Sequence, residues 1–193
     1  MYSTQRKTAP RVVGGRVLRK NNHEVTRSFD TPFVSRERPG KGYRHVLAQR
    51  DVYQFVTLVP DFDELSRGLS GIVLAAGDPW IDGRIHGGVI YLCAWESDLT
   101  SDLGEDYFEE HRDIFARLGV PSDPVKNGRV TCHFDEPSAR AYQLLHVFLH
   151  ELGHHHDSMT TRSKIGNRGE AFAESFARER EAMVWDRYAR VMR

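Results

Sequence analysis

The feature of this sequence that most constrains its fold is a long helical pattern over 137–157, which combines apolar residues with several histidines. The stretch 139–149 carries apolar residues on almost every side, so we expect a helix that is buried. His146, His150 and His154 follow one another at intervals of four, which places them on one face of that helix. Buried ring nitrogens need partners, and a metal ion is one way to supply them.

The segment His150-Glu151-Leu152-Gly153-His154 has the spacing HExxH. Two histidines four residues apart on a helix have Cβ atoms about 5–6 Å apart. Both imidazoles can therefore reach one zinc ion at Zn–N distances of about 2.0–2.1 Å. Glu151 is turned away from that axis, so it can reach a water on the metal without being a ligand. The motif predicts His150 and His154 as metal ligands and Glu151 as the catalytic general base. Gly153, on the flank of the histidine face, predicts close approach of another backbone.

A catalytic zinc usually takes three protein ligands, so a third ligand is needed. The metzincin pattern is excluded, because Asp157 and Thr160 stand where that pattern needs Gly and His. On the next predicted helix, 169–191, Glu170 and Glu174 lie one turn apart on one face. We expect Glu170 to be the third ligand and Glu174 to accept a hydrogen bond from a ligand histidine.

Other interpretations of these acidic residues stay open. The second helix could be a surface helix in which Glu174 pairs with Arg178, or Glu174 could replace Glu170 as the ligand. His146 and Asp157 share the metal face, so each could be an extra ligand. We expect them instead to hydrogen-bond around the ligands or to be polar residues near the helix end.

In these two segments the chain resembles the gluzincin arrangement of thermolysin-like zinc peptidases, over roughly 136–177, about a fifth of its length. The resemblance implies a small, single-domain, zincin-like metallopeptidase with one Zn²⁺ ion, in which a zinc-activated water attacks the peptide bond and Glu151 is the general base. It gives Glu170 the role of ligand and Glu174 that of the acid that orients a histidine. Gly169, Ala173 and the Glu at 174 depart from the residues common in that family.

The same resemblance implies that an edge strand beside the site binds extended substrate by adding it to the sheet. The expected strand over 86–95 is the candidate, and an interior sheet strand is the alternative. A donor that stabilises the developing oxyanion is not identifiable from the sequence. Residues of suitable chemistry are Tyr142, His86, Arg162 and Lys164. The substrate-binding residues stay unknown.

A strand-rich half followed by helices predicts an α+β fold, with a small, mostly antiparallel or mixed sheet packed on the buried metal-binding helix and a C-terminal helix. Expected strands are 52–59, 70–76, 86–95 and 129–134, with a short strand pair over 12–18. Two of them, 70–76 and 86–95, should form a long-looped hairpin. Expected helices are 62–68, with Asp61 as its cap, 106–118, 137–157 and 169–191. Residues 46–193 would form the zincin-like domain.

Residues 1–45 should form a basic, loosely structured arm. The first 50 residues hold 12 Lys/Arg and three Asp/Glu, a balance of +9, and the remaining 143 have a balance of −9. Such an arm could contact nucleic acid or dock on the acidic remainder of its own chain. No apolar run approaches the length of a membrane span and no secretory signal is visible, so we expect no membrane contact and, by default, a cytoplasmic protein. Cys93 and Cys132 should be reduced cysteines in strands.

Three functions are compatible with these features. The first is a metallopeptidase that cleaves peptides or proteins. The second is a catalytically silent or regulatory zinc-binding domain, whose basic arm contacts nucleic acid or a protein partner. The third is a zinc hydrolase that acts on a bond other than a peptide bond. The oligomeric state is not indicated by the sequence.

Overall fold

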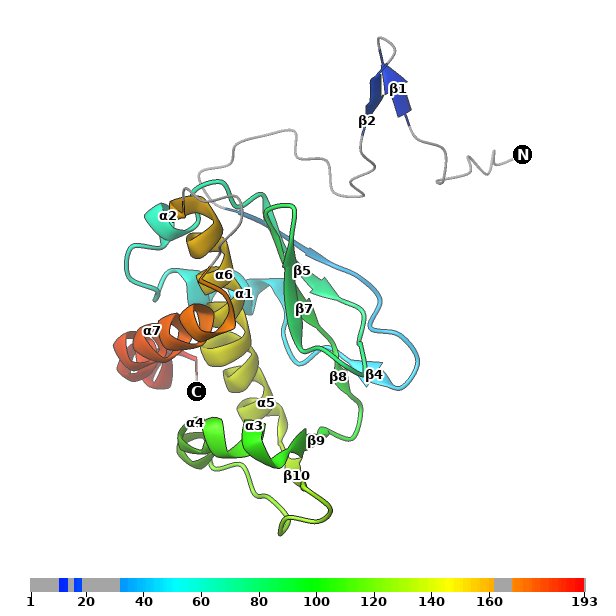
Figure 1. The fold of residues 1–193 in the computed structure, drawn as a ribbon, viewed down its shortest axis with the longest axis vertical. Coiled ribbons are helices and arrows are strands. Elements are labelled where there is room, and N and C mark those ends of the chain that lie inside the picture. Colours follow the sequence, from blue (N-terminus) through cyan, green and yellow to red (C-terminus); the bar gives the residue numbers. More distant parts are fainter. Residues whose placement is uncertain (1–10, 14–15, 19–31, 162–167, 193) are drawn as a thin grey trace, which may run out of the picture.

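A four-stranded mixed sheet forms the centre of the part of the chain that the computed structural model describes, residues 11–13, 16–18, 32–161 and 168–192 (Figure 1). Its strands are β3 (Phe33–Arg36), β5 (Gly71–Ala75), β6 (Gly83–His86) and β7 (Val89–Cys93). The spatial order is β3-β5-β7-β6; β3, β5 and β7 are parallel, and β6 is antiparallel to β7. This small mixed sheet and the helices beside it confirm the α+β class.

The two central strands, β5 and β7, are covered on both faces. Every residue of β5 is buried, and in β7 Tyr91 alone is half-buried. The two strands run parallel, so the hairpin predicted from 70–76 and 86–95 is wrong. The tight turn lies instead between β6 and β7, where Gly87 and Gly88 have φ angles of 59° and 75°. The strand β6 forms one edge of the sheet. Because it is short and less apolar than its neighbours, the apolar pattern of the sequence did not predict it.

Two smaller sheets lie beside the central one. They pair β4 (Tyr43–Arg44) with β8 (Trp95–Glu96) and β9 (Thr100–Gly104) with β10 (Arg129–His133). β10 confirms the strand predicted over 129–134, and the pair β1 (Arg11–Val13) and β2 (Arg16–Leu18) confirms the one predicted over 12–18. Because β3 and β4 lie within 1–45, the expected basic arm overlaps the folded sheets. Much of that arm, 1–10 and 19–31, lies outside the described residues.

The segment predicted as a strand over 52–59 is largely helix α1 (Gln49–Val56), so that prediction is wrong. The buried residues of this helix lie at helical spacing and are Val52, Phe55 and Val56. Asp51 closes the first turn, because its carboxylate accepts a hydrogen bond from the Ala48 amide at 2.8 Å. Val and Phe favour strands by propensity, but burial at positions i, i+3 and i+4 decides the structure here.

Three short helices follow at intervals: α2 (Phe62–Leu65), α3 (Glu105–Glu110) and α4 (Arg112–Leu118). α2 agrees with the helix predicted over 62–68, although Asp61 makes no side-chain capping bond and has a φ angle of 57°. The single helix predicted over 106–118 is divided at His111, whose φ and ψ angles of −105° and 10° are not helical. His111 is buried, with 5% of its surface exposed.

One helical rod runs without interruption over 136–160 and confirms the helix predicted over 137–157. It consists of α5 (Glu136–Tyr142), the π-helical segment η1 (Gln143–Phe148) and α6 (Leu149–Thr160). Asp135 caps its start, since the carboxylate accepts a hydrogen bond from the Ser138 amide at 2.8 Å. The next helix, α7 (Glu170–Val191), confirms the helix predicted over 169–191.

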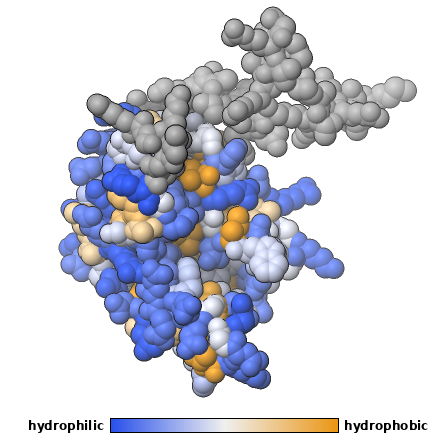
Figure 2. All heavy atoms as spheres, in the orientation of Figure 1, coloured by the Kyte–Doolittle hydropathy of each residue, from blue (hydrophilic) through white to orange (hydrophobic). Residues whose placement is uncertain are grey.

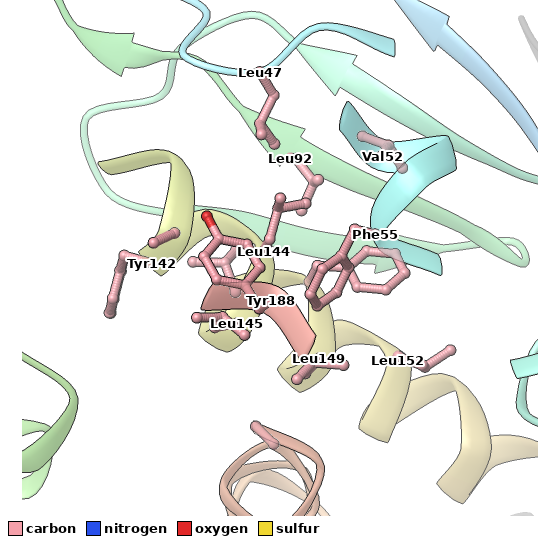
Figure 3. Packing of buried hydrophobic residues seen from close by; sticks show 14 of the residues in the cluster. Leu47, Val52, Phe55, Leu92, Tyr142, Leu144, Leu145, Leu149, Leu152 and Tyr188 are labelled. Atoms are coloured by element: carbon pink, nitrogen blue, oxygen red, sulfur yellow. The ribbon is translucent and has the colours of Figure 1, made fainter. Parts of the chain in front are cut away.

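The rod is anchored by apolar contacts to the sheet, to α1 and to α7 (Figure 3). Four leucines of the rod are fully buried: Leu144, Leu145, Leu149 and Leu152. Phe55 of α1 meets Phe148 of the rod edge-on, with ring centroids 5.7 Å apart, and Tyr188 of α7 at 6.1 Å. Each such side chain contributes about 1.5–3 kcal/mol when it is buried. These contacts fix the axis of the helix that carries the HExxH motif.

The surface is mostly hydrophilic on the face that Figure 2 shows, with small hydrophobic areas between. Among the described residues, no helix combines the length and apolar character that a membrane span requires. Cys93 lies in β7 and Cys132 in β10, and both are buried, free thiols, as predicted.

α6 and α7 pack closely where Gly153 faces Ala173, which confirms the close backbone approach predicted at this glycine. A Cβ atom on Gly153 would lie 3.0 Å from the Cα of Ala173 and 3.2 Å from its carbonyl oxygen. Such contacts with backbone cannot be relieved by a side-chain movement. The helices can reach this distance only because the residue at position 153 has no side chain.

Gly153→Ala should lower the free energy of unfolding by about 1–3 kcal/mol, because the added methyl group pushes the two helices apart. This loss outweighs the roughly 1 kcal/mol by which Ala exceeds Gly in helix propensity. Urea denaturation measures the change. The matched control is Gly104→Ala, whose Cβ would meet nothing within 4 Å. A Gly153→Ala protein as stable as the control would contradict the close packing.

Candidate metal centre

The side chains of His150, His154 and Glu170 converge on one point between α6 and α7. The Nε2 atoms of His150 and His154 are 3.1 Å apart, and Glu170 Oε2 lies 3.1 Å from the first and 3.4 Å from the second. Two ligands of a tetrahedral zinc with bonds of 2.0–2.1 Å lie roughly 3.3 Å apart. The triangle of donor atoms thus matches one face of such a tetrahedron in size. Imidazole nitrogen and carboxylate oxygen are also ligand types that zinc prefers.

The triangle is open on the side of Glu170. The imidazole side chains are 20% and 21% exposed, whereas the side chain of Glu170 is 83% exposed, although its carboxylate reaches both rings. Glu170 is the first residue of α7 and follows Gly169, whose φ angle of 73° turns the chain into the helix. An ion held by these atoms would have one side free for water or substrate, as catalytic rather than structural zinc sites require.

Glu174 contacts the nitrogen of His150 that faces away from this triangle. Its Oε2 lies 3.3 Å from Nδ1 of His150. A carboxylate only accepts, so Nδ1 donates and the lone pair stays on Nε2, where a metal would bind. Burial alone would raise the pKa of Glu174, but the neighbouring imidazoles of His111 and His150 hold that pKa well below its usual range. Glu174 also pairs with Arg178, at 2.8 Å, as the alternative interpretation expected.

Glu151 lies beside the triangle and is directed toward the edge strand β6. Its side chain is buried, and a Cβ atom on Gly83 of β6 would lie 3.3 Å from Glu151 Oε1. Burial raises the pKa of this carboxyl group to about 7. A carboxyl group with such a pKa can accept and release a proton near neutral pH.

Asp157 is not part of this centre, which corrects the prediction that it would support the ligands. Its carboxylate accepts bonds from the Arg168 amide at 2.6 Å, from Arg168 Nε at 2.7 Å and from the Thr161 hydroxyl at 2.7 Å. Burial alone would raise the pKa of Asp157, but these bonds lower it to about 2. Asp157 therefore ties the end of α6 to the residues that enter α7.

His146 is also directed away from the triangle. It is buried beside His111, with ring centroids 4.5 Å apart, and its Nε2 lies 3.8 Å from Glu174 Oε2. Burial lowers the pKa of His146 to about 3, so this ring is neutral. His146 thus belongs with Glu174 and not among the three convergent donor atoms.

The residues considered as oxyanion donors lie in different environments. Tyr142 is buried, and its hydroxyl shares a hydrogen bond of 2.6 Å with that of Tyr107. His86 ends β6 and lines a hollow beside His154. Arg162 and Lys164 lie outside the described residues.

The sequence did not predict His111 and Tyr107, which precede His150 by 39 and 43 residues. Both line the cavity that also contains His150 and Glu174. A weak signal was present, because His111 stands three and four residues before the buried Ile114 and Phe115, on the apolar side of the predicted helix.

Two hollows flank the triangle. One, of about 790 Å³, runs along β6 past Glu151 and His154. The other, of about 450 Å³, lies between residues 80–83, residues 102–104 and the helical rod. No protein-family model, curated protein or solved structure matches this chain. The candidate centre is therefore defined by its own residues and geometry.

The buried carboxyl group of Glu151 gives the metal-free protein a distinct pH dependence. Its folded pKa of about 7 lies above its ordinary value of 4.5, so its ionisation destabilises the fold as the pH rises from about 4.5 to 7. Metal-free Glu151→Gln should therefore be more stable than the parent by about 1–3 kcal/mol at pH 8, with little difference near pH 4. Urea denaturation at the two pH values measures this, and a constant difference would contradict it.

Proposed function

We propose that this chain is a zinc-dependent hydrolase, and that its reaction is the cleavage of peptide bonds. The observation that carries the proposal is the triangle of His150, His154 and Glu170, with distances of 3.1–3.4 Å between its donor atoms, beside the buried Glu151. A structural zinc site would be closed by four protein ligands. Here the exposed side of Glu170 leaves room for a reacting group.

Each residue has a separate task. His150, His154 and Glu170 would hold one zinc ion, which when bound acts as a Lewis acid and lowers the pKa of water. Glu151 takes the proton of the attacking water and passes it to the leaving amine. Glu174 keeps the Nε2 lone pair of His150 available by accepting from Nδ1.

An extended peptide would bind along β6. The candidate strand expected over 86–95 is mostly β7, which lies between β5 and β6, so its edges are occupied. Among the described strands of this sheet, β6 has a free edge, and the larger hollow follows it past Glu151 and His154. A peptide added to this edge by main-chain hydrogen bonds would pass the general base and the ligands. This arrangement favours a peptide bond over other hydrolysable bonds.

Glu151→Gln should keep zinc binding and lose at least about 100-fold in turnover, because the amide cannot take a proton. Zinc content and cleavage of a mixture of unstructured peptides measure the two properties. The matched control is Glu181→Gln, which changes another buried glutamate, paired with Arg117 at 2.7 Å. Full activity of Glu151→Gln would contradict the mechanism.

The same assay separates the rival functions. If the zinc-loaded parent cleaves no peptide but hydrolyses a small amide or ester, the chain is a hydrolase of non-peptide bonds. If it binds zinc and hydrolyses neither, it is a zinc-binding domain without catalysis. The basic arm invoked for such a domain lies largely outside the described residues.

A further inference from the structure

Glu174 lies at the centre of a buried cluster that extends beyond the metal ligands. Its Oε2 faces His150 Nδ1 at 3.3 Å and His146 Nε2 at 3.8 Å. Its Oε1 faces Arg178 Nε at 2.8 Å and His111 Nε2 at 3.4 Å. The side chain of Glu174 is 13% exposed and that of His111 is 4% exposed, so solvent offers little competition for these contacts.

The backbone carbonyl of Tyr107 occupies Nδ1 of His111, so Nε2 is the nitrogen that faces Glu174. Nδ1 of His111 lies 2.7 Å from the carbonyl oxygen of Tyr107, and a carbonyl only accepts, so Nδ1 donates. Nε2 is buried and has no hydrogen-bond partner within 3.5 Å at a suitable angle. The nearest carboxylate oxygen is Glu174 Oε1, which lies 3.4 Å away.

The ring of His111 is held in this direction from several sides. It stacks on Tyr107 with centroids 3.9 Å apart and meets His146 edge-on at 4.5 Å. The break between α3 and α4 falls at His111 itself. The local fold thus places one imidazole nitrogen against Glu174.

A second metal ion is a weaker explanation of this cluster. His111, His146 and Glu174 could form a ligand group, since their donor atoms lie within 4.8 Å of one another. However, Arg178 already donates to the oxygen of Glu174 that faces His111. The distances of 3.4 and 3.8 Å to the imidazoles are also longer than most of those in the triangle of His150, His154 and Glu170.

We propose that His111 is a positioning residue for the metal ligand His150, and that it acts through Glu174. In this arrangement His111 carries a proton on each ring nitrogen, so that Nδ1 donates to Tyr107 and Nε2 donates to Glu174 Oε1, which fixes the carboxylate in direction. The other oxygen then accepts from His150 Nδ1, so that the lone pair of His150 Nε2 points at Glu170 Oε2 and His154 Nε2. This inference rests on the proposed function, because it presumes a metal ion at those atoms.

Two substitutions of His111 separate its two hydrogen bonds. His111→Asn places an amide near the position of Nδ1, so it keeps the bond to Tyr107 and loses the one to Glu174. His111→Gln reaches the position of Nε2 and keeps a donor to Glu174. We expect zinc affinity, measured by competition with a chelator, to fall about tenfold or more in His111→Asn and to stay within about threefold of the parent in His111→Gln. The visible spectrum of bound Co²⁺ should shift in the first variant alone.

Further variants distinguish the failure of this inference from the failure of the proposed function. His150→Ala should lose zinc binding; if it binds zinc like the parent, the proposed centre is wrong and the inference falls with it. If His150→Ala loses zinc but His111→Asn and His111→Gln have equal affinities and spectra, only the role of His111 is overturned. A second equivalent of zinc in the parent, absent from His111→Asn, would also overturn it. Glu181→Gln controls for a lost buried ion pair on α7 and should match the parent.

Discussion

The close packing of α6 on α7 is the contact on which the rest of this site depends. Gly153 has no side chain, so α7 approaches α6 until Ala173 lies against it. Glu174 directly follows Ala173 and Glu170 lies three residues before it, so this approach brings both carboxylates to the same histidine, His150. A wider separation of the helices would remove the third donor atom and the acceptor for His150 Nδ1 together.

The carboxyl groups around His150 share a small volume but have opposite electrostatic environments. Glu151 lies beside Gly83 of the strand β6, and burial raises its pKa to about 7. Glu174 is also partly buried, but histidines and Arg178 surround it, and its pKa stays low. Groups of one chemical type can thus take different roles: in the proposed mechanism Glu151 exchanges protons and Glu174 holds a ligand in direction. Glu170, at the exposed start of α7, keeps the site open to solvent.

The sequence predicted the C-terminal half of this fold well and the N-terminal half poorly, for physical reasons. The long rod and α7 have enough turns for helical periodicity to be decisive, and the spacing of HExxH itself fixes the relation between His150 and His154. α1 was mistaken for a strand because eight residues rich in Val and Phe satisfy both patterns. The parallel pairing of β5 and β7 was missed because β6 is short and less apolar. His111 could not be placed, since its role depends on a contact between residues 63 positions apart.

The central claim is that α6 and α7 jointly hold one zinc ion. The most direct test is the zinc content of the purified parent beside that of Glu170→Ala, measured by mass spectrometry of the metal. The geometry predicts about one zinc per chain in the parent and well below one in the variant, because two histidines alone leave the tetrahedron incomplete. Equal zinc content in the two proteins, or none in the parent after it is supplied with zinc, would contradict the account.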